Sequence, residues 1–300
     1  MKNNGNEKAY LALTAICIIW GTTFLAMKVG ARAYPSILLV ALRQSLAGCI
    51  LWTIGRWKKF PHPSKKDFFH IAIVSFLIVF FPAILMPLQL KNLPSGLMSL
   101  INATVPMFAL IINLIFRKGK DVTMLAALGI LLGFSGMFFL YKDNVHEFIN
   151  HDYFWGFILA LIGAASSAGG LIYSAKMSTK IHPIYFAGYQ YILAAIALYF
   201  VSFSFEEIHS IDVYSKSTIA LIYASILGSV IGLPAYLYAL SKLPSTLVSV
   251  YAYINPIIAL TIGAIILNEK LDQNIFIAGG CIIAGVYIIN NNSKIQKNKA

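Results

Sequence analysis

Long runs of apolar residues separated by short polar segments dominate this chain. A helix that crosses the roughly 30 Å hydrocarbon core of a bilayer needs about 20 mainly apolar residues. Most joints between the runs carry Pro, Lys, Asp or Asn, which mark the ends of helices. The pattern predicts an all-α membrane protein with ten transmembrane helices, at residues 10–29, 36–54, 68–90, 95–116, 122–141, 153–174, 184–203, 217–240, 245–267 and 274–289.

Composition excludes a water-soluble protein. Of the 300 residues, 59% are hydrophobic and only 11% are charged, whereas about a quarter of a soluble domain is charged. The first apolar run, about 19 residues, is longer than the core of a signal peptide, so we expect a retained helix. The three cysteines lie inside apolar runs, which indicates buried small side chains and neither disulfides nor a metal site.

The net charge of +12 does not indicate nucleic-acid binding, because the positive residues cluster in short segments between the apolar runs. Such clusters set membrane topology. If the N-terminus is cytoplasmic, sixteen positive residues lie inside: Lys2, Lys8, Arg56, Lys58, Lys59, Lys65, Lys66, Arg117, Lys118, Lys120, Lys176, Lys180, Lys242, Lys294, Lys297 and Lys299. Six lie outside: Lys28, Arg32, Lys91, Lys142, Lys216 and Lys270. The bias predicts that both termini are cytoplasmic.

The chain contains an internal repeat. Residues 93–99 (LPSGLMS) return 150 residues later as residues 243–249 (LPSTLVS), and Pro106 returns as Pro256. Nearer the start of each half the offset is about 148, so Lys28 matches Lys176. The repeat predicts two halves, residues 9–141 and 153–290, of five spans each. Because five is odd, the second half is expected to be inverted, as in many secondary transporters with a substrate site near the bilayer midplane.

Several motifs resemble the drug/metabolite transporter superfamily, in particular its EamA-type permeases. They are the run WGTTF at residues 20–24, Arg43, the proline-centred fourth and ninth spans, and NEK at residues 268–270. The resemblance spans essentially the whole chain and implies export of amino acids, other metabolites or drugs. The chain departs from the pattern where RKGK at residues 117–120 replaces the acidic residue that often closes the fourth span. The second half also lacks counterparts of Trp20 and Arg43.

Polar and small residues recur at helical spacing along the first, third, fourth, eighth and ninth spans. A polar stripe that faces lipid is costly, so these faces are expected to point inward. Inward faces serve either a cavity or helix packing, and prolines within spans act either as hinges or as fixed kinks. The candidate substrate pathway consists of Trp20, Thr23, Arg43, Met86, Asn102, Pro106, Tyr236, Tyr253 and Pro256.

Arg43 is the clearest charge inside a span, about 12 Å along the helix from Pro35. A guanidinium at that depth is expected either to bind a carboxylate or phosphate of a substrate, or to bond backbone carbonyls and reach toward the interface. No Asp or Glu lies in the middle of a span. Because proton-coupled carriers commonly relay protons through such residues, facilitated movement or exchange fits the sequence better.

An enzyme is not expected, since the sequence has no HExxH motif, no Ser/His/Asp constellation, no paired carboxylates and no phosphate-binding glycine loop. No cofactor is expected either. The sequence therefore favours a secondary transporter or exporter in the plasma or inner membrane. Its partners would be the bilayer and a small amino-acid-like or other organic solute, moved by alternating access. A multidrug or lipid exporter of the same fold and a non-transporting scaffold are the alternatives, and the oligomeric state stays open.

Overall fold

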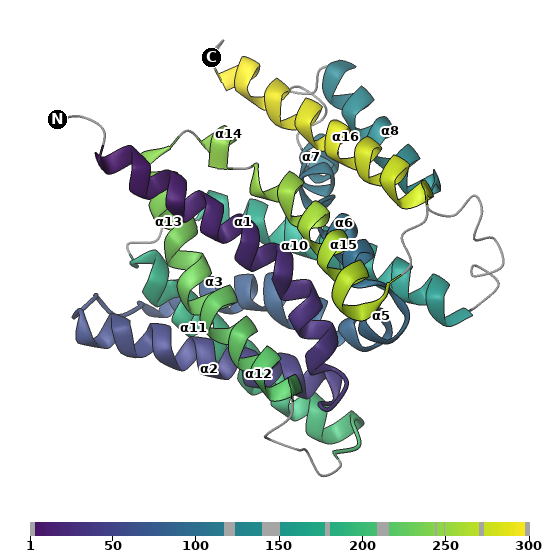
Figure 1. Ribbon diagram of the computed structural model, residues 1–300. Helices are drawn as coiled ribbons and strands as arrows, with labels where there is room; N and C mark the ends of the chain where they lie inside the picture. The colour runs from purple at the N-terminus through teal and green to yellow at the C-terminus, as the bar shows by residue number, and fades with distance from the viewer. Residues whose placement is uncertain are drawn as a thin grey trace.

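The computed structural model describes residues 4–116, 124–139, 151–177, 181–208, 216–243, 245–248, 250–269 and 273–297 (Figure 1). Within these ranges every regular element is a helix, which confirms the all-α prediction. A helix satisfies its backbone hydrogen bonds internally, where lipid offers none. The first part contains α1 (Asn4–Gly30), α2 (Ser36–Trp57), α3 (Lys65–Ser75), η1 (Phe76–Phe80), α4 (Phe81–Ile84), α5 (Met86–Asn92), α6 (Ser95–Asn102), α7 (Val105–Phe116) and α8 (Met124–Phe139).

The second part contains α10 (His151–Lys176), α11 (Pro183–Phe205), α12 (Lys216–Tyr223), η2 (Ala224–Ile231), α13 (Gly232–Lys242), α14 (Ser245–Val248), α15 (Tyr251–Leu267) and α16 (Gln273–Lys297). Across both parts, seven stretches are long and apolar enough to cross a bilayer: Glu7–Gly30, Ser36–Trp57, Lys65–Ile84, Ser95–Ile112, Asp152–Lys176, Pro183–Phe205 and Lys216–Lys242. Shorter apolar helices, Ala127–Gly136, Tyr251–Leu267 and Gln273–Ile288, occupy the other predicted positions. Both ends of the predicted span 122–141 lie outside the described residues. The chain is a multi-pass helical membrane protein.

The third and eighth predicted spans each contain a π-helical segment, in which hydrogen bonds skip one residue more than in an α-helix. These segments are η1 and η2, and a shift of 150 residues places η1 inside η2. Pro82 and Pro234 follow within three residues and have no N–H to donate. Both halves therefore interrupt the α-helix of their third span at equivalent positions with a π-helical segment, which a proline follows within three residues.

The fourth predicted span is interrupted. Helix α6 ends at Asn102 and α7 begins at Val105, with a turn between them. Pro106 cannot donate to the carbonyl of Asn102 as a continuous helix requires, and Thr104 Oγ1 instead donates to the carbonyl of Ile101 over 2.6 Å. A single span at 95–116 was predicted, with Pro106 as a hinge or a kink, and the structure has two helices there. In the ninth span, Pro256 lies inside α15 without a break.

Helices of the two predicted halves pair in a repeated way. Helix α2 packs along α11, and α8 packs along α16 at one side of the molecule (Figure 1). Helix α1 contacts α13 and α15 of the second half, and its repeat counterpart α10 contacts α5 and α7 of the first half. Equivalent helices of the two halves thus make equivalent contacts across the interface.

Glycines bring α8 and α16 into backbone contact, which small residues make possible in membrane helices. A Cβ on Gly285 would lie 2.5 Å from the carbonyl oxygen of Gly129 and 2.8 Å from the nitrogen of Gly133. We expect Gly285→Ala to lower the free energy of unfolding by about 1–3 kcal/mol, because backbone atoms cannot yield and the helices must separate. Thermal unfolding in detergent, followed by size-exclusion chromatography, measures the loss.

Gly280→Ala on the same helix is the matched control, since its Cβ would meet nothing within 4 Å. Equal stability of the two variants would show that α8 and α16 do not pack in this way.

Candidate functional site

Two adjoining cavities lie between the helices of the two halves. The first has a volume of about 300 Å³, and its polar lining consists of Arg43, Gln44, Gln89, Asn102, Ser167, Gln190 and Tyr191. The second has a volume of about 520 Å³ and is lined by residues of α1, η1, α6, α7, α10, α13 and α15. Both cavities are lined by Phe24, Ile78, Asn102 and Ser167. These four residues therefore form the boundary between the cavities. Each cavity is about large enough for a small metabolite.

Arg43 lies in the wall of the first cavity, and helix α2 carries it there. Its Nη2 donates to Ser229 Oγ over 3.3 Å. Its Nε is buried and has no hydrogen-bond partner among the described residues. Within the part of the chain that the structure describes, no carboxylate forms an ion pair with Arg43. A buried guanidinium without a counter-charge is costly unless something supplies one, so the cavity favours an anionic group.

Gln44 follows Arg43 in the chain and lines the same cavity. Its Oε1 is a buried acceptor without a partner among the described residues. Buried polar atoms normally have partners. Arg43 and Gln44 therefore line one cavity, and each has a buried polar atom without a partner, a donor on Arg43 and an acceptor on Gln44. A solute that carries an acceptor such as a carboxylate and a donor such as an amine would match them.

Three aromatic rings pack together at the second cavity. Trp20 lies 5.4 Å from Tyr236 and 4.9 Å from Tyr251, measured between ring centroids, and the two tyrosines are 5.6 Å apart. Tyr236 and Tyr251 line the cavity, and Trp20 lies behind them. Trp20 Nε1 donates to the carbonyl of Gly228 in η2 over 2.9 Å, so the indole ties α1 to the π-helical segment of the other half. The lining here suits an apolar or aromatic part of a solute.

Six of the nine predicted pathway residues line a cavity. Arg43, Met86 and Asn102 line the first, and Asn102, Pro106, Tyr236 and Pro256 line the second. Asn102 belongs to both.

The other three predicted residues lie behind the wall or away from it. Trp20 supports the tyrosines, and buried Thr23 donates from Oγ1 to the carbonyl of Ile19 over 2.7 Å. Tyr253 packs against Tyr287 of α16, with 6.4 Å between ring centroids, and does not line either cavity.

Sequence reasoning missed Gln44, Gln190, Tyr191, Tyr251 and Asn255, all of which line a cavity. One signal was available: Gln44 and Gln190 are polar residues within otherwise apolar runs and are expensive in lipid. Tyr191 lies 148 residues after Arg43, the repeat offset of that region, and lines the same cavity. Among the described residues, no group of three or more His, Cys, Asp or Glu side chains is placed to hold a metal ion.

Known proteins resemble this chain along nearly its whole length. The uncharacterized inner membrane transporter YedA of Escherichia coli (strain K12) is 27% identical over 281 residues, covering 93% of this chain and 89% of the relative. The uncharacterized transporter YvbV of Bacillus subtilis (strain 168) is 25% identical and covers 100% of this chain and 97% of the relative. An uncharacterized transporter of Archaeoglobus fulgidus is 27% identical and covers 94% and 97%.

A solved crystal structure aligns with a TM-score of 0.65 at 17% identity, covering 94% of this chain and 96% of the other, which supports the fold. Residues 7–142 and 154–291 each match the EamA-like transporter family, and together they account for most of the chain. With relatives named as transporters and a multi-pass helical fold, the chain belongs to the EamA-like transporter family.

Proposed function

We propose that this protein is a secondary carrier for a small organic solute bearing a carboxylate, amino-acid-like in its polar groups, moved by alternating access. The environment of Arg43 carries the proposal. Its guanidinium lies in the wall of a cavity between the halves, and among the described residues it has one hydrogen bond and no acidic partner. A carboxylate would supply the missing charge through charge-assisted hydrogen bonds. Gln44 would accept from the amine.

The carrier mechanism rests on ten spans in two inverted repeats, residues 9–141 and 153–290. Three features support that arrangement: the 150-residue sequence repeat, the π-helical segments at equivalent positions, and the equivalent pairing of helices across the interface. Two equivalent halves can exchange roles, so that the cavity opens to one side and then to the other. The excess of positive residues in the predicted inner segments supports cytoplasmic termini. With that orientation, the ends of α1 and α15 near Lys28 and Glu269 would face outward.

A drug or lipid exporter of the same fold is the second candidate. The observation that favours it is the second cavity, where Tyr236, Leu240 and Leu171 contribute mainly apolar and aromatic surface. That solute would need no carboxylate, so the two candidates differ in what Arg43 contributes.

Flux into proteoliposomes tests the proposal. Purified protein is reconstituted, and uptake of labelled neutral amino acids is compared with uptake of the matching decarboxylated amines, a cationic dye and a fluorescent phospholipid. We expect uptake of at least one amino acid or other carboxylate, accelerated when the same unlabelled solute is loaded inside, because exchange returns the carrier. Uptake confined to the amine, dye or lipid favours the second candidate, and no uptake of any solute contradicts a carrier.

A further inference from the structure

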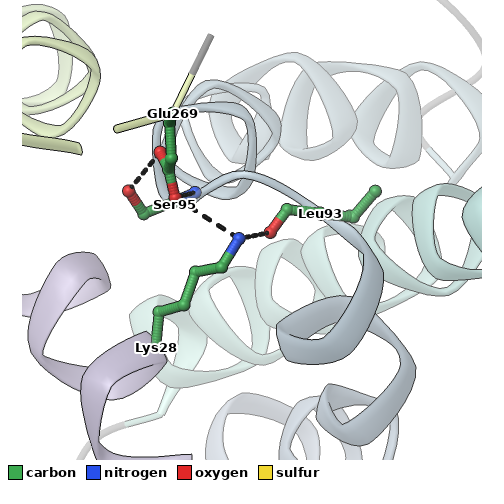
Figure 2. A network of polar contacts seen from close by, with 4 residues as sticks. All are labelled: Lys28, Leu93, Ser95 and Glu269. Carbon is green, nitrogen blue, oxygen red and sulfur yellow. Dashed lines mark hydrogen bonds and ion pairs between the residues drawn. The ribbon is translucent and has the colours of Figure 1, made fainter. Parts of the chain in front are cut away.

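Glu269 ties together helices from both halves at one end of the molecule (Figure 2). Its carboxylate accepts from the backbone nitrogen of Ser95 over 2.9 Å and from Ser95 Oγ over 2.8 Å. Lys28 Nζ lies 3.3 Å from the same carboxylate and donates to the carbonyl of Leu93 over 2.6 Å. Lys28, Leu93, Ser95 and Glu269 are called the outer network below. Three of its residues belong to the first half and Glu269 to the second.

The backbone after α15 is shaped to place this carboxylate. Asn268 adopts the left-handed conformation, with φ of 54°, and the nitrogen of Glu269 donates to the carbonyl of Gly263 over 3.3 Å. This is a helix C-terminal motif that turns the chain back on itself. A Cβ on Gly263 would lie 2.3 Å from Glu269 Oε2 and 2.6 Å from Ser95 Oγ. The glycine therefore leaves the room in which the carboxylate meets Ser95.

A second carboxylate repeats the arrangement at the same end. Glu206, which follows α11, accepts from the backbone nitrogens of Ile37 and Leu38 over 2.8 and 2.9 Å. Helix α2 has Pro35 before it and no side-chain cap of its own, so Glu206 supplies the cap. A turn of five residues joins α1 to α2, which places Glu206 and Glu269 at one end of the bundle. Each of these two carboxylates, both from the second half, caps a helix of the first half.

The opposite end has no such pair in the sequence. Under the repeat, Lys28 and Ser95 correspond to Lys176 and Ser245, but Glu269 corresponds to Gly119 and Glu206, at the offset of 148, to Lys58. The lysine and the serine are therefore duplicated, whereas both carboxylates are present only at the end near Lys28. The two carboxylate contacts between the halves described above therefore have no counterpart in the repeated sequence.

We propose that Glu269, assisted by Glu206, is the gate of the outer end: it holds the two halves together there, and its release opens the cavity to the outside. This rests on the alternating access proposed above. Lys28 and Glu269 are 23% and 10% exposed, so their attraction is less screened than that of a surface pair. Opening that end must separate Glu269 from Ser95 and Lys28, because they belong to different halves.

Cysteine accessibility tests the gate without any knowledge of the solute. Met86, in the wall of the first cavity, is replaced by cysteine in a chain whose Cys17, Cys49 and Cys281 are alanine. A membrane-impermeant maleimide is applied to intact cells and, separately, to inverted vesicles. We expect Glu269→Gln to raise the labelling rate from outside about tenfold and to lower it from inside, since a shift between two states is reciprocal.

Lys28→Met is expected to have a smaller effect in the same directions, because it leaves both bonds to Ser95. Asp67→Asn is the matched control: Asp67 also caps a helix, α3, but its partner Ser64 lies in the same segment, so no contact between the halves is lost. Labelling that rises from both sides indicates general loosening and overturns the gate, as does labelling unchanged in both Glu269→Gln and Lys28→Met. If Glu269→Gln fails to fold, Glu269→Asp and Lys28→Met decide by the same criterion.

The outcome is separable from that of the proposed function. Shifted labelling without flux of any solute would keep the gate and reject the carrier substrates tested. Flux with unshifted labelling would keep the carrier and reject the gate.

Discussion

Arg43→Gln is expected to lower the initial rate of carboxylate uptake into proteoliposomes about 100-fold at low solute concentration, since charge-assisted hydrogen bonds contribute about 1.5–3 kcal/mol each. Glutamine keeps an amide donor at about the position of Nε but loses the positive charge and the planar fork. Uptake of the matching amine, which has no carboxylate, is expected to stay the same or to rise. The ratio of the two rates measures selectivity independently of the amount of folded protein.

Two further variants separate binding from folding. Arg43→Lys keeps the charge and should recover part of the rate, because a lysine is a point charge without bidentate geometry. Arg32→Gln removes an exposed arginine of the turn between α1 and α2 and should leave uptake unchanged. If Arg43→Gln transports carboxylates at the original rate, Arg43 is structural. The same conclusion follows if Arg43→Gln cannot be reconstituted and Arg43→Lys, which can, does not distinguish carboxylates from amines.

The positions of the helices could be predicted from the sequence because lipid imposes a simple rule. Each span needs an apolar run of fixed length, and each joint needs polar residues. The interruption at Ala103 and Thr104 does not follow from that rule. Pro106 and Pro256 are equivalent in sequence, yet only the first breaks its helix. The outcome depends on whether neighbouring groups satisfy the freed carbonyl, and at the first site Thr104 provides the local turn.

The candidate cavity was predicted in outline, since Arg43, Asn102 and Tyr236 are polar or aromatic residues on faces that lipid disfavours. The sequence prediction chose Tyr253 and not Tyr251, because helical periodicity alone does not tell which of the two residues faces a cavity. Both flank Ala252 by about 100° on the helix, on opposite sides. Helices α1 and α13 lie on the side of Tyr251 and form the cavity with it, whereas α16 covers Tyr253. The packing of the neighbouring helices therefore decides which edge of a polar stripe faces a cavity.

The backbone of the two halves is similar, whereas their polar groups differ, and the two features have different consequences. Equivalent helix pairs lie across the interface, as the proposed alternating access requires if both ends of the cavity are to close in a similar way. Arg43 has Tyr191 as its repeat counterpart, and both line one cavity, so the charge there is single. The residue equivalent to Glu269 is Gly119, so the carboxylate of the outer network is likewise not duplicated in the sequence. In the proposed carrier mechanism, a duplicated framework with unduplicated charges would favour one closed end and one orientation of the solute.

Ser167→Trp is expected to stop uptake of every solute, charged or not. Ser167 lies on α10 at the boundary shared by the two cavities, so a bulky indole there would fill the passage between them. Ile162→Trp on the same helix is the matched control, because Ile162 is 42% exposed on the outside of the bundle and lines neither cavity.

Uptake of an amino acid and of an amine distinguishes a blocked passage from a lost charge. Ser167→Trp should reduce both rates to those of empty liposomes, whereas Arg43→Gln should reduce only the rate for the amino acid. Normal uptake by Ser167→Trp would mean that solutes do not pass between these two cavities, and the pathway would have to be sought elsewhere between the halves.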